Sequence, residues 1–458
     1  MAQPFYLVTA ERSKLQKIAR YARSIVQGND GDPVIAVGSL RIVLTPEAVG
    51  KIIDRAQPED ITGRRKSFDE IMSGMGAQST APVGHERLAT LLAAREPAEI
   101  SAIPRQTGPD SDLFIDGWDW HLKRTRLVDA WSLLGTHTHI DWGNIRVGQI
   151  DTGFRVIPCL GFPNPKNPKS DFVLTDLDRN YFPYDFNYDP VQHAGNPFAS
   201  EYSAEDPLLG GAFDGHGTRT GSVLAGFDPT ADTPYFGAAP RVPFIPVRIC
   251  DNVIINHVQE PLSKAIEHLV QNGCSVITLS MGMALTLIQD RLRKAINYAY
   301  EQGVIFVSAA GNIWDTVVAP ARLNRTLAVG GCTPSLTPWN GSSFGPEVDL
   351  CAPAWPIRRA SVDRKGQPTY GYGDGTSFAT PMVAATAAMW LLHRGPEIEQ
   401  AYPYKWQRVE AFKRVVTTTA APGSHWNTKL YGSGILDAFA ALTEALPAAS
   451  SLLEDKSA

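Results

Sequence analysis

The sequence has few cysteines for its length and no long apolar run. Five cysteines stand among 458 residues, so at least one must be unpaired, and no Cys-x-x-Cys pair is present. These absences speak against a disulfide scaffold and a structural zinc site. No apolar stretch approaches the roughly 20 residues that span a bilayer. We therefore expect no membrane partner, and cysteines that serve as small buried side chains in a reducing compartment.

A basic surplus and a secretory leader are also lacking. The formal net charge is −5, whereas proteins that bind nucleic acids usually carry a positive excess. The first residues, Met-Ala-Gln-Pro-Phe-Tyr-Leu-Val, run into charges at Glu11 and Arg12 without the basic start and apolar core of a signal peptide. The sequence thus predicts no nucleic-acid partner and a cytoplasmic location, with secretion left open if a leader has been trimmed.

The length and the local patterns predict more than one domain. Residues 1–95 alternate strand and helix patterns and are expected to form a small α/β domain, with a mobile polar loop over 58–85. Residues 96–115 carry prolines and acids and are predicted to be a linker. The last residues, 447–458, are rich in alanine and serine, which favours a flexible tail.

The largest domain is predicted over residues 116–446. Apolar strands are expected at 145–150, 244–249, 275–279, 304–308 and 326–329, with amphipathic helices at 262–271 and 285–302. Strand–helix alternation of this kind implies right-handed crossovers and a mostly parallel sheet, an α/β fold. An insertion at 158–210, rich in proline, aromatics and acids, interrupts the pattern and is predicted to be a surface excursion with aromatic anchors.

Three short segments carry residues suited to catalysis. Residues 147–153 read Val-Gly-Gln-Ile-Asp-Thr-Gly and place Asp151 at the carboxyl end of a strand, where parallel sheets bind ligands. Residues 214–221 read Asp-Gly-His-Gly-Thr-Arg-Thr-Gly and place His216 at the start of a helix. Residues 373–382 read Gly-Asp-Gly-Thr-Ser-Phe-Ala-Thr-Pro-Met, with Ser377 at the tip of an apolar helix. Each segment alone also fits a turn, a loop or a helix cap.

Together the three segments supply a nucleophile, a base and an acid that orients the base. As a set they resemble the subtilisin-like serine proteases, over about residues 116–443. The resemblance implies a three-layer fold around a parallel sheet of about seven strands, and catalytic roles for Asp151, His216 and Ser377. It further implies a serine endopeptidase that acts on protein or peptide substrates through an acyl-enzyme and requires no cofactor.

The resemblance also implies an oxyanion donor and a substrate strand. Residues 307–312, Val-Ser-Ala-Ala-Gly-Asn, would place the Asn312 amide beside the backbone N–H of Ser377. Residues 278–282, Thr-Leu-Ser-Met-Gly, are similar to the family's substrate-binding strand, with an exposed edge for an extended peptide. Glycine at its end would leave the first pocket open. We accordingly predict substrate contacts at Ser280, Met281, Gly282, Ala309, Ala310 and Gly311.

The sequence offers a weak calcium motif. Asp176, Asp178 and Asn180 begin like a calcium-binding loop, but Tyr181 stands where the sharp turn requires glycine. The predicted site therefore contains no metal, and calcium is left as an unsupported alternative.

Several alternatives stay open. The same fold could be a catalytically silent peptide-binding or regulatory module, or a protease with one protein target. The N-terminal domain could be a removable prodomain or a permanent regulatory domain. We expect it to dock on the peptidase domain, with residues 96–115 either along the cleft or elsewhere.

Overall fold

The computed structural model separates into two compact units. One lies within Met1–Ala98, and the other comprises Glu99–Met283 and Leu287–Ala458. The structure describes residues 5–9, 18, 34–38, 41–44, 49, 52, 68–74 and 77–83 of the first unit, and residues 119–163, 169–182, 203–206, 213–231, 234–283, 287–312, 316–363, 367–423 and 426–458 of the second. The predicted linker, 96–115, lies outside the described residues.

The first unit contains a four-stranded antiparallel sheet in the order β2-β3-β1-β4, formed by β1 (Phe5–Thr9), β2 (Val34–Gly38), β3 (Arg41–Leu44) and β4 (Ser79–Val83). Helix α3 (Phe68–Gly74) contributes buried Phe68 and Met72. The loop predicted over 58–85 is therefore wrong for α3 and β4. Strand β4 contains Pro82, which is tolerated because β4 is an edge strand, where a residue without an N–H need not donate to a neighbour.

The second unit is built on a sheet of seven strands in which every pairing is parallel. The strand order is β15 (Leu350–Pro353), β14 (Leu327–Cys332), β13 (Ile305–Ala309), β12 (Val276–Leu279), β7 (Val147–Asp151), β11 (Phe244–Arg248) and β8 (Arg179–Asn180). The predicted parallel α/β sheet is confirmed, and all five predicted strands are present. The edge strands β8 and β15 were not predicted.

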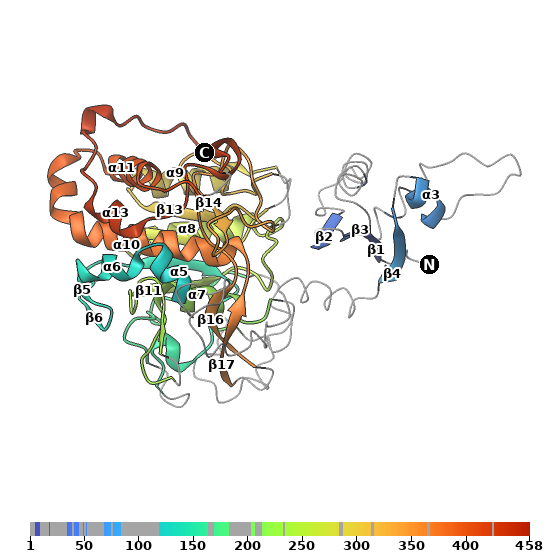
Figure 1. The fold of residues 1–458 in the computed structure, drawn as a ribbon, viewed down its shortest axis with the longest axis horizontal. Helices are drawn as coiled ribbons and strands as arrows, with labels where there is room; N and C mark the ends of the chain where they lie inside the picture. The colour runs from blue at the N-terminus through green and yellow to red at the C-terminus, as the bar shows by residue number, and fades with distance from the viewer. Residues whose placement is uncertain are drawn as a thin grey trace, which may run out of the picture. The chain divides into compact units, whose positions relative to one another are not determined.

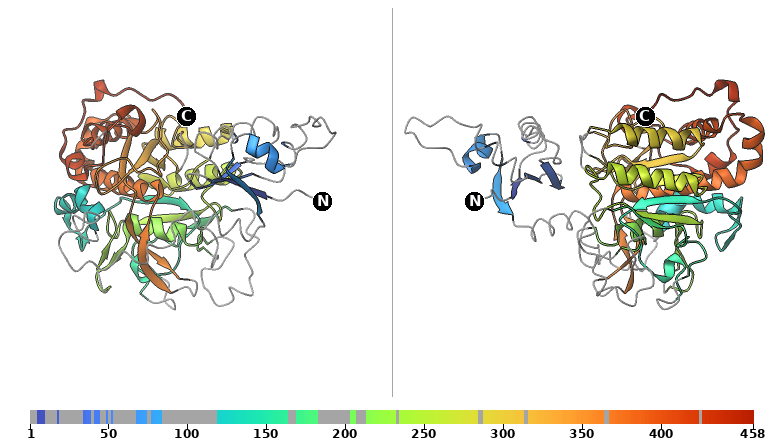
Figure 2. Two further views of the ribbon diagram at one scale, coloured as in Figure 1. Left: turned by 45° about the vertical axis from the view of Figure 1, so that its right-hand side comes forward. Right: turned by 180° about the vertical axis from the view of Figure 1, so that it is seen from behind.

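Helices cover both faces of this sheet. Helices α7 (His216–Ala225) and α10 (Thr376–Ala401) pack on one face (Figure 1), and α8 (Gln259–Gln271) and α9 (Asp290–Glu301) lie side by side on the other (Figure 2). Alternate residues of β7 serve the two layers, because Val147 joins the core beneath α7 and α10 and Ile150 joins the core beneath α8 and α9. The arrangement is the expected three-layer fold.

Smaller elements complete the second unit. They are α5 (Trp120–Arg124), α6 (Leu127–Ser132), β5 (Gly135–Thr136), β6 (His139–Ile140), η2 (Pro158–Leu160), β9 (Phe227–Asp228), β10 (Tyr235–Phe236), β16 (Ile357–Val362), β17 (Pro368–Gly373), α11 (Lys405–Thr418), α12 (Thr428–Tyr431), α13 (Ala438–Thr443) and η3 (Ala449–Ser451).

The insertion at 158–210 differs from the predicted surface excursion in its described parts. Phe162 and Phe172 are buried in the main core, and β8 extends the central sheet. Asp206, near the end of the insertion, is fully buried. Burial of Phe162 and Phe172 confirms the predicted aromatic anchors and stabilises these stretches against the unit. The pairing of β8 with the central sheet was not predicted.

The C-terminal residues are packed, which corrects the predicted flexible tail. Leu452 joins the core beneath α10, and Ala458 joins the core beneath α9. The guanidinium of Arg325 bonds the backbone C=O of Asp455 and the carboxylate of Glu454. Anchors of this kind come from residues far away in the sequence, so the composition of the tail did not reveal them.

Three further expectations concern cysteine, metal and membrane. All five cysteines are free and buried, which confirms the prediction of small buried side chains. In the described parts of the chain, no three His, Cys, Asp or Glu side chains gather as potential metal ligands. Among the same residues, no helix combines the length and apolarity that a membrane crossing requires.

Candidate active site

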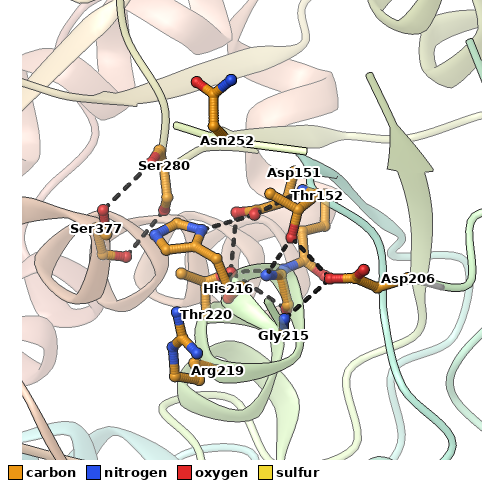
Figure 3. Close-up of polar contacts among 12 residues, drawn as sticks. Asp151, Thr152, Asp206, Gly215, His216, Arg219, Thr220, Asn252, Ser280 and Ser377 are labelled. Atoms are coloured by element: carbon orange, nitrogen blue, oxygen red, sulfur yellow. Dashed lines mark hydrogen bonds and ion pairs between the residues drawn. The ribbon is translucent and has the colours of Figure 1, made fainter. Parts of the chain in front are cut away.

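The predicted catalytic residues gather at the carboxyl edge of the central sheet. Asp151 ends β7, while Ser280 and Asn312 follow β12 and β13. Because neighbouring parallel strands end at the same edge, their final residues meet there. The starts of α7 and α10 bring His216 and Ser377 to this edge, and Figure 3 shows both with Asp151 and Ser280.

Asp151 and His216 form a buried hydrogen-bonded pair. The imidazole Nδ1 lies 2.7 Å from Asp151 Oδ1, and both residues are at most 2% exposed. The same oxygen accepts from the backbone N–H of Thr152 at 2.7 Å, and Oδ2 accepts from the Thr220 hydroxyl at 3.0 Å. A carboxylate that accepts these bonds fixes the Nδ1–H tautomer of the ring. The other ring nitrogen points to the side on which Ser377 lies (Figure 3).

Helix α7 can approach the end of β7 because its second residue is glycine. A Cβ at Gly217 would lie 1.9 Å from the C=O of Gly153 and 3.1 Å from Cβ of Asp151. Gly215, before the helix, has φ +68°, a conformation that side chains disfavour. The glycines on both sides of His216 therefore position its ring against Asp151.

Ser377 is the second residue of α10 and is 7% exposed. Its hydroxyl donates to the C=O of Ser280 at 3.2 Å. In return, the Ser280 hydroxyl donates to the C=O of Ser377 at 2.8 Å. This second bond explains why Pro381 is tolerated in the helix, since proline has no N–H for the carbonyl four residues before it. Ser280 supplies the missing donor.

The orientation of the Asn312 side chain suits a donor. Its Oδ1 accepts from both the N–H and the hydroxyl of Thr376, each at 2.9 Å, so the amide nitrogen must face the other way. A Cβ at Gly375 would lie 3.3 Å from Nδ2 of Asn312 and 3.5 Å from the backbone nitrogen of Ser377. Because Gly375 has no side chain, the space beside both nitrogens stays clear.

The predicted substrate strand differs from expectation. The N–H of Gly282 donates to the C=O of Val253 at 3.0 Å, and its C=O accepts from Ile255 at 3.0 Å. A Cβ at Gly282 would lie 2.2 Å from Val318, so the space predicted to be open is filled. Met281 is buried in the core on the α8 side. Residues 253–255 thus already pair with the edge that a peptide was expected to use.

Residues 309–311 also have internal partners. The N–H of Ala310 donates to Val329, and its C=O accepts from Val318. Ala310 is fully buried and Ala309 is 3% exposed, whereas Gly311 is half-buried. The structure therefore argues against Ala310 as a substrate contact. A substrate role for Ala309 or Gly311 stays a prediction.

An ion pair that the sequence analysis missed lies behind the Asp151 loop. Arg248, at the end of β11, lies 3.5 Å from Asp206, and both side chains are fully buried. Asp206 also accepts from the N–H of Gly215 at 2.9 Å and from the hydroxyl of Thr152 at 3.4 Å. One carboxylate from the insertion thus links the loop after β7 to the start of α7. The arginine inside an apolar strand was the available signal.

Two residues of the weak calcium motif, Asp178 and Asn180, have hydrogen-bond partners within the chain. Asp178 accepts from the N–H of Ala204 at 2.8 Å and from the hydroxyl of Ser203 at 3.3 Å. The Asn180 side chain accepts from the N–H of Phe182 at 3.0 Å. Burial raises the pKa of Asp178 to about 6, despite the bonds from Ala204 and Ser203 that favour its charged form.

Known sequences are similar to up to half of this chain. Subtilisin Savinase of Lederbergia lenta is 29% identical over 229 residues, which cover 50% of this chain and 77% of that protein. Thermitase of Thermoactinomyces vulgaris is 31% identical over 178 residues, 38% of this chain and 61% of that protein. An alkaline protease of Alkalihalobacillus alcalophilus is 29% identical over 229 residues, which cover 50% of this chain and 55% of that protein. The chain thus matches only about half the length of that relative.

Solved structures share the fold. Proteases from Pseudoalteromonas arctica align with a TM-score of 0.52 at 19% identity over 71% of this chain and 97% of that chain. The prenylagaramide maturation protease PagA aligns with a TM-score of 0.50 at 24% identity over 69% of this chain and 99% of that chain. The Subtilase family model matches residues 144–438, which include every residue of the site described above. The chain therefore belongs to the subtilase family.

Proposed function

We infer that this chain is a serine endopeptidase in which Ser377 is the nucleophile, His216 the general base and acid, and Asp151 the residue that orients His216. The observation that carries the proposal is the 2.7 Å bond between His216 Nδ1 and Asp151 Oδ1, in a ring whose second nitrogen points toward Ser377. Membership of the subtilase family supports protein or peptide substrates.

The geometry suggests how the proton moves. With Nδ1–H donating to Asp151, the neutral imidazole keeps a lone pair on Nε2. The Ser377 hydroxyl, which now donates to Ser280, must rotate about its side-chain bond to reach that lone pair. Catalytic hydrogen bonds of this kind often form fully only when substrate binds. Ser377 Oγ then attacks the peptide carbonyl carbon as its proton passes to Nε2.

The remaining steps return the enzyme to its starting state. The C–N bond breaks, the leaving amine takes the proton from Nε2, and the acyl group stays on Ser377 Oγ. Water then repeats the attack with His216 as base, which releases the acid and restores the hydroxyl. In this proposal the Asn312 amide and the backbone N–H of Ser377 hold the oxyanion in both halves. No step calls for a cofactor.

The experiment that tests this function is the Ser377→Ala variant of the full chain, assayed on casein and on a peptide library. We expect cleavage to be lost while circular dichroism and the melting temperature stay close to those of the parent. Cleavage by the variant at the parental rate would contradict the proposal. The library profile of the parent also tests the alternatives. A silent binding module would cleave no member, and a protease dedicated to one target would cleave very few.

We also propose that the N-terminal unit regulates the protease unit. Support comes from its separate sheet within Met1–Ala98 and from the linker composition that follows. A tethered segment acts at high effective concentration, so even a weak fit would inhibit. Residues 1–115, added to a protease unit that begins near residue 115, should inhibit it; no inhibition at high micromolar concentration would contradict the proposal.

We propose a cytoplasmic location for the protein, which the five free buried cysteines support.

A further inference from the structure

A polar side chain lies buried in the middle of the strand that ends at Asp151. Gln149 is 2% exposed, and its neighbours along β7 are Val147, Gly148 and Ile150. Because side chains alternate along a strand, Gln149 and Asp151 project from the same face of the sheet, toward α7. A buried amide costs free energy unless it is bonded. Its partners therefore show what the position is used for.

Both hydrogens of the Gln149 amide have acceptors on α7. Nε2 donates to the C=O of Gly217 at 2.7 Å and to the hydroxyl oxygen of Thr220 at 2.8 Å. The carbonyl acceptor fixes which end of the amide faces the helix, because a carbonyl cannot donate. The second amide hydrogen then falls on Thr220. Gly221 admits the amide, since a Cβ there would lie 2.9 Å from its oxygen.

This arrangement determines where the Thr220 proton goes. With the Gln149 amide donating to it, the hydroxyl must use its own hydrogen elsewhere. Asp151 Oδ2 lies 3.0 Å away, and the carbonyls of His216 and Gly217 lie 3.2 Å away. The carboxylate is the shortest contact and carries the charge, so its bond is the strongest of the three.

We propose that Thr220 and Gln149 are positioning residues for the catalytic pair. The Gln149 amide orients the Thr220 hydroxyl, and the hydroxyl holds Oδ2 of Asp151 so that Oδ1 stays aligned with His216 Nδ1. This inference rests on the proposed function of Asp151. It assigns to two side chains outside the predicted triad the task of fixing the rotation of its carboxylate.

Thr220→Val removes the hydroxyl and keeps the shape of the side chain. We expect kcat to fall roughly tenfold to a hundredfold with KM changed by less than about twofold, because a hydrogen bond to a charged group is lost while substrate contacts stay. Thr220→Ser keeps the hydroxyl and should recover most of the rate. Gln149→Leu should give a smaller loss, since the Thr220 hydrogen would then be shared with the nearby backbone carbonyls.

The double variant tests the coupling between the two residues. If Gln149 acts through Thr220, adding Gln149→Leu to Thr220→Val should cost almost nothing further in kcat. The matched control is Thr386→Val on α10, a fully buried threonine whose hydroxyl donates to the C=O of Met382 at 2.9 Å. It removes a hydroxyl from a helix in the same way, without touching Asp151, and kcat should stay at the parental value.

A readout that does not depend on cleavage is the downfield proton resonance of His216 Nδ1–H in the full-length protein. We expect this resonance to shift and exchange faster with water in Thr220→Val and to be unchanged in Thr386→Val. A Thr220→Val protein with parental kcat and an unchanged resonance would overturn the inference. If the Thr220→Val protein fails to fold, Gln149→Leu tests the same positioning role through its smaller expected loss of kcat. If Asp151→Asn cleaves at the parental rate, the proposed function itself fails. If Asp151→Asn is inactive while Thr220→Val keeps the parental kcat, only the positioning inference fails.

Discussion

Polar side chains gather at both ends of the strands of the central sheet, the carboxyl edge and the amino edge, but they have different roles there. At the carboxyl edge, the bonds to Asp151 come from a ring nitrogen, a backbone N–H and a hydroxyl, and they leave the His216 ring directed toward Ser377. At the amino edge, Asp349 immediately precedes β15, and the ammonium of Lys413 lies 3.5 Å from it. The first edge orients groups for reaction, whereas the second ties elements together.

Basic side chains at the amino edge bind the C-terminal segment. Arg325, two residues before β14, bonds Asp455 and stacks over the Tyr300 ring at 4.5 Å. Lys413 lies 3.7 Å from the Asp455 carboxylate. Burial disfavours the charge on Lys413, but the carboxylates of Asp349 and Asp455 outweigh it and raise its pKa. Substitutions at the two edges should therefore fail in different ways, through turnover at one and through stability at the other.

The largest effect should come from Asp151→Asn at the carboxyl edge. The amide would favour the wrong tautomer of His216, and kcat should fall on the order of 10⁴-fold. The melting temperature should change little compared with that loss. Steady-state kinetics and calorimetry on the same preparation check both parts. If Asp151→Asn instead lowers the melting temperature while its folded fraction keeps the parental kcat, the distinction between the two edges is wrong.

The next largest effect should come from Asn312→Ala. The amide acts on charge that develops mainly in the transition state, so kcat should fall roughly 10²–10³-fold with little change in KM. Asn312 also bonds Thr376 through Oδ1, so Asn312→Asp is the matched variant that keeps that acceptor and removes the donor. Parental turnover in both variants would leave Asn312 with a turn-forming role only.

At the amino edge, Arg325→Leu should lower the free energy of unfolding by about 2–3 kcal/mol, because several charge-assisted bonds to the C-terminal segment are lost. Activity per folded molecule should stay at the parental level. Chemical denaturation measures the first quantity and active-site titration the second. Arg322→Leu, three residues earlier and half-buried, is the control and should be close to neutral. Equal losses in the two variants would show that the bonds to Asp455 contribute little.

The smallest effect concerns Asp178, which immediately precedes β8, the strand paired with the carboxyl end of β11. Its folded-state pKa, raised to about 6, lies above its ordinary value of 3.8. The folded protein therefore binds this proton more tightly than the unfolded chain, and the free energy of unfolding should fall as pH rises through that interval. Asp178→Asn should then stabilise the protein by about 1–3 kcal/mol near pH 8 and hardly at all near pH 4. Chemical denaturation of the parent and the variant at both pH values checks this. A stability change that is the same at pH 4 and pH 8 would contradict it.

Most of the sheet could be predicted because its strands are short apolar runs separated by amphipathic helices. β8 was missed because Arg179 and Asn180 are polar, and its pairing with β11 depends on the fold of the insertion. The C-terminal segment was misjudged for a similar reason, since its partners Arg325 and Tyr300 are more than a hundred residues away.

The candidate site was predictable where a local motif fixes the backbone. Glycines beside His216 and before Ser377 place both side chains at helix starts, and Asp151 follows from the end of its strand. The substrate edge was not predictable, because its occupation by residues 253–255 is a contact between two loops. Gln149 was visible as an amide inside an apolar strand, but its link to Thr220 required the register of α7 against β7.

The most direct test of the central claim is covalent labelling of the full-length protein with a fluorophosphonate, followed by peptide mapping by mass spectrometry. The account predicts close to one label per active molecule, attached to Ser377, and labelling that becomes far slower in His216→Ala because the hydroxyl has lost its base. Labelling at another serine, or an equal rate of Ser377 labelling in the parent and in His216→Ala, would contradict it.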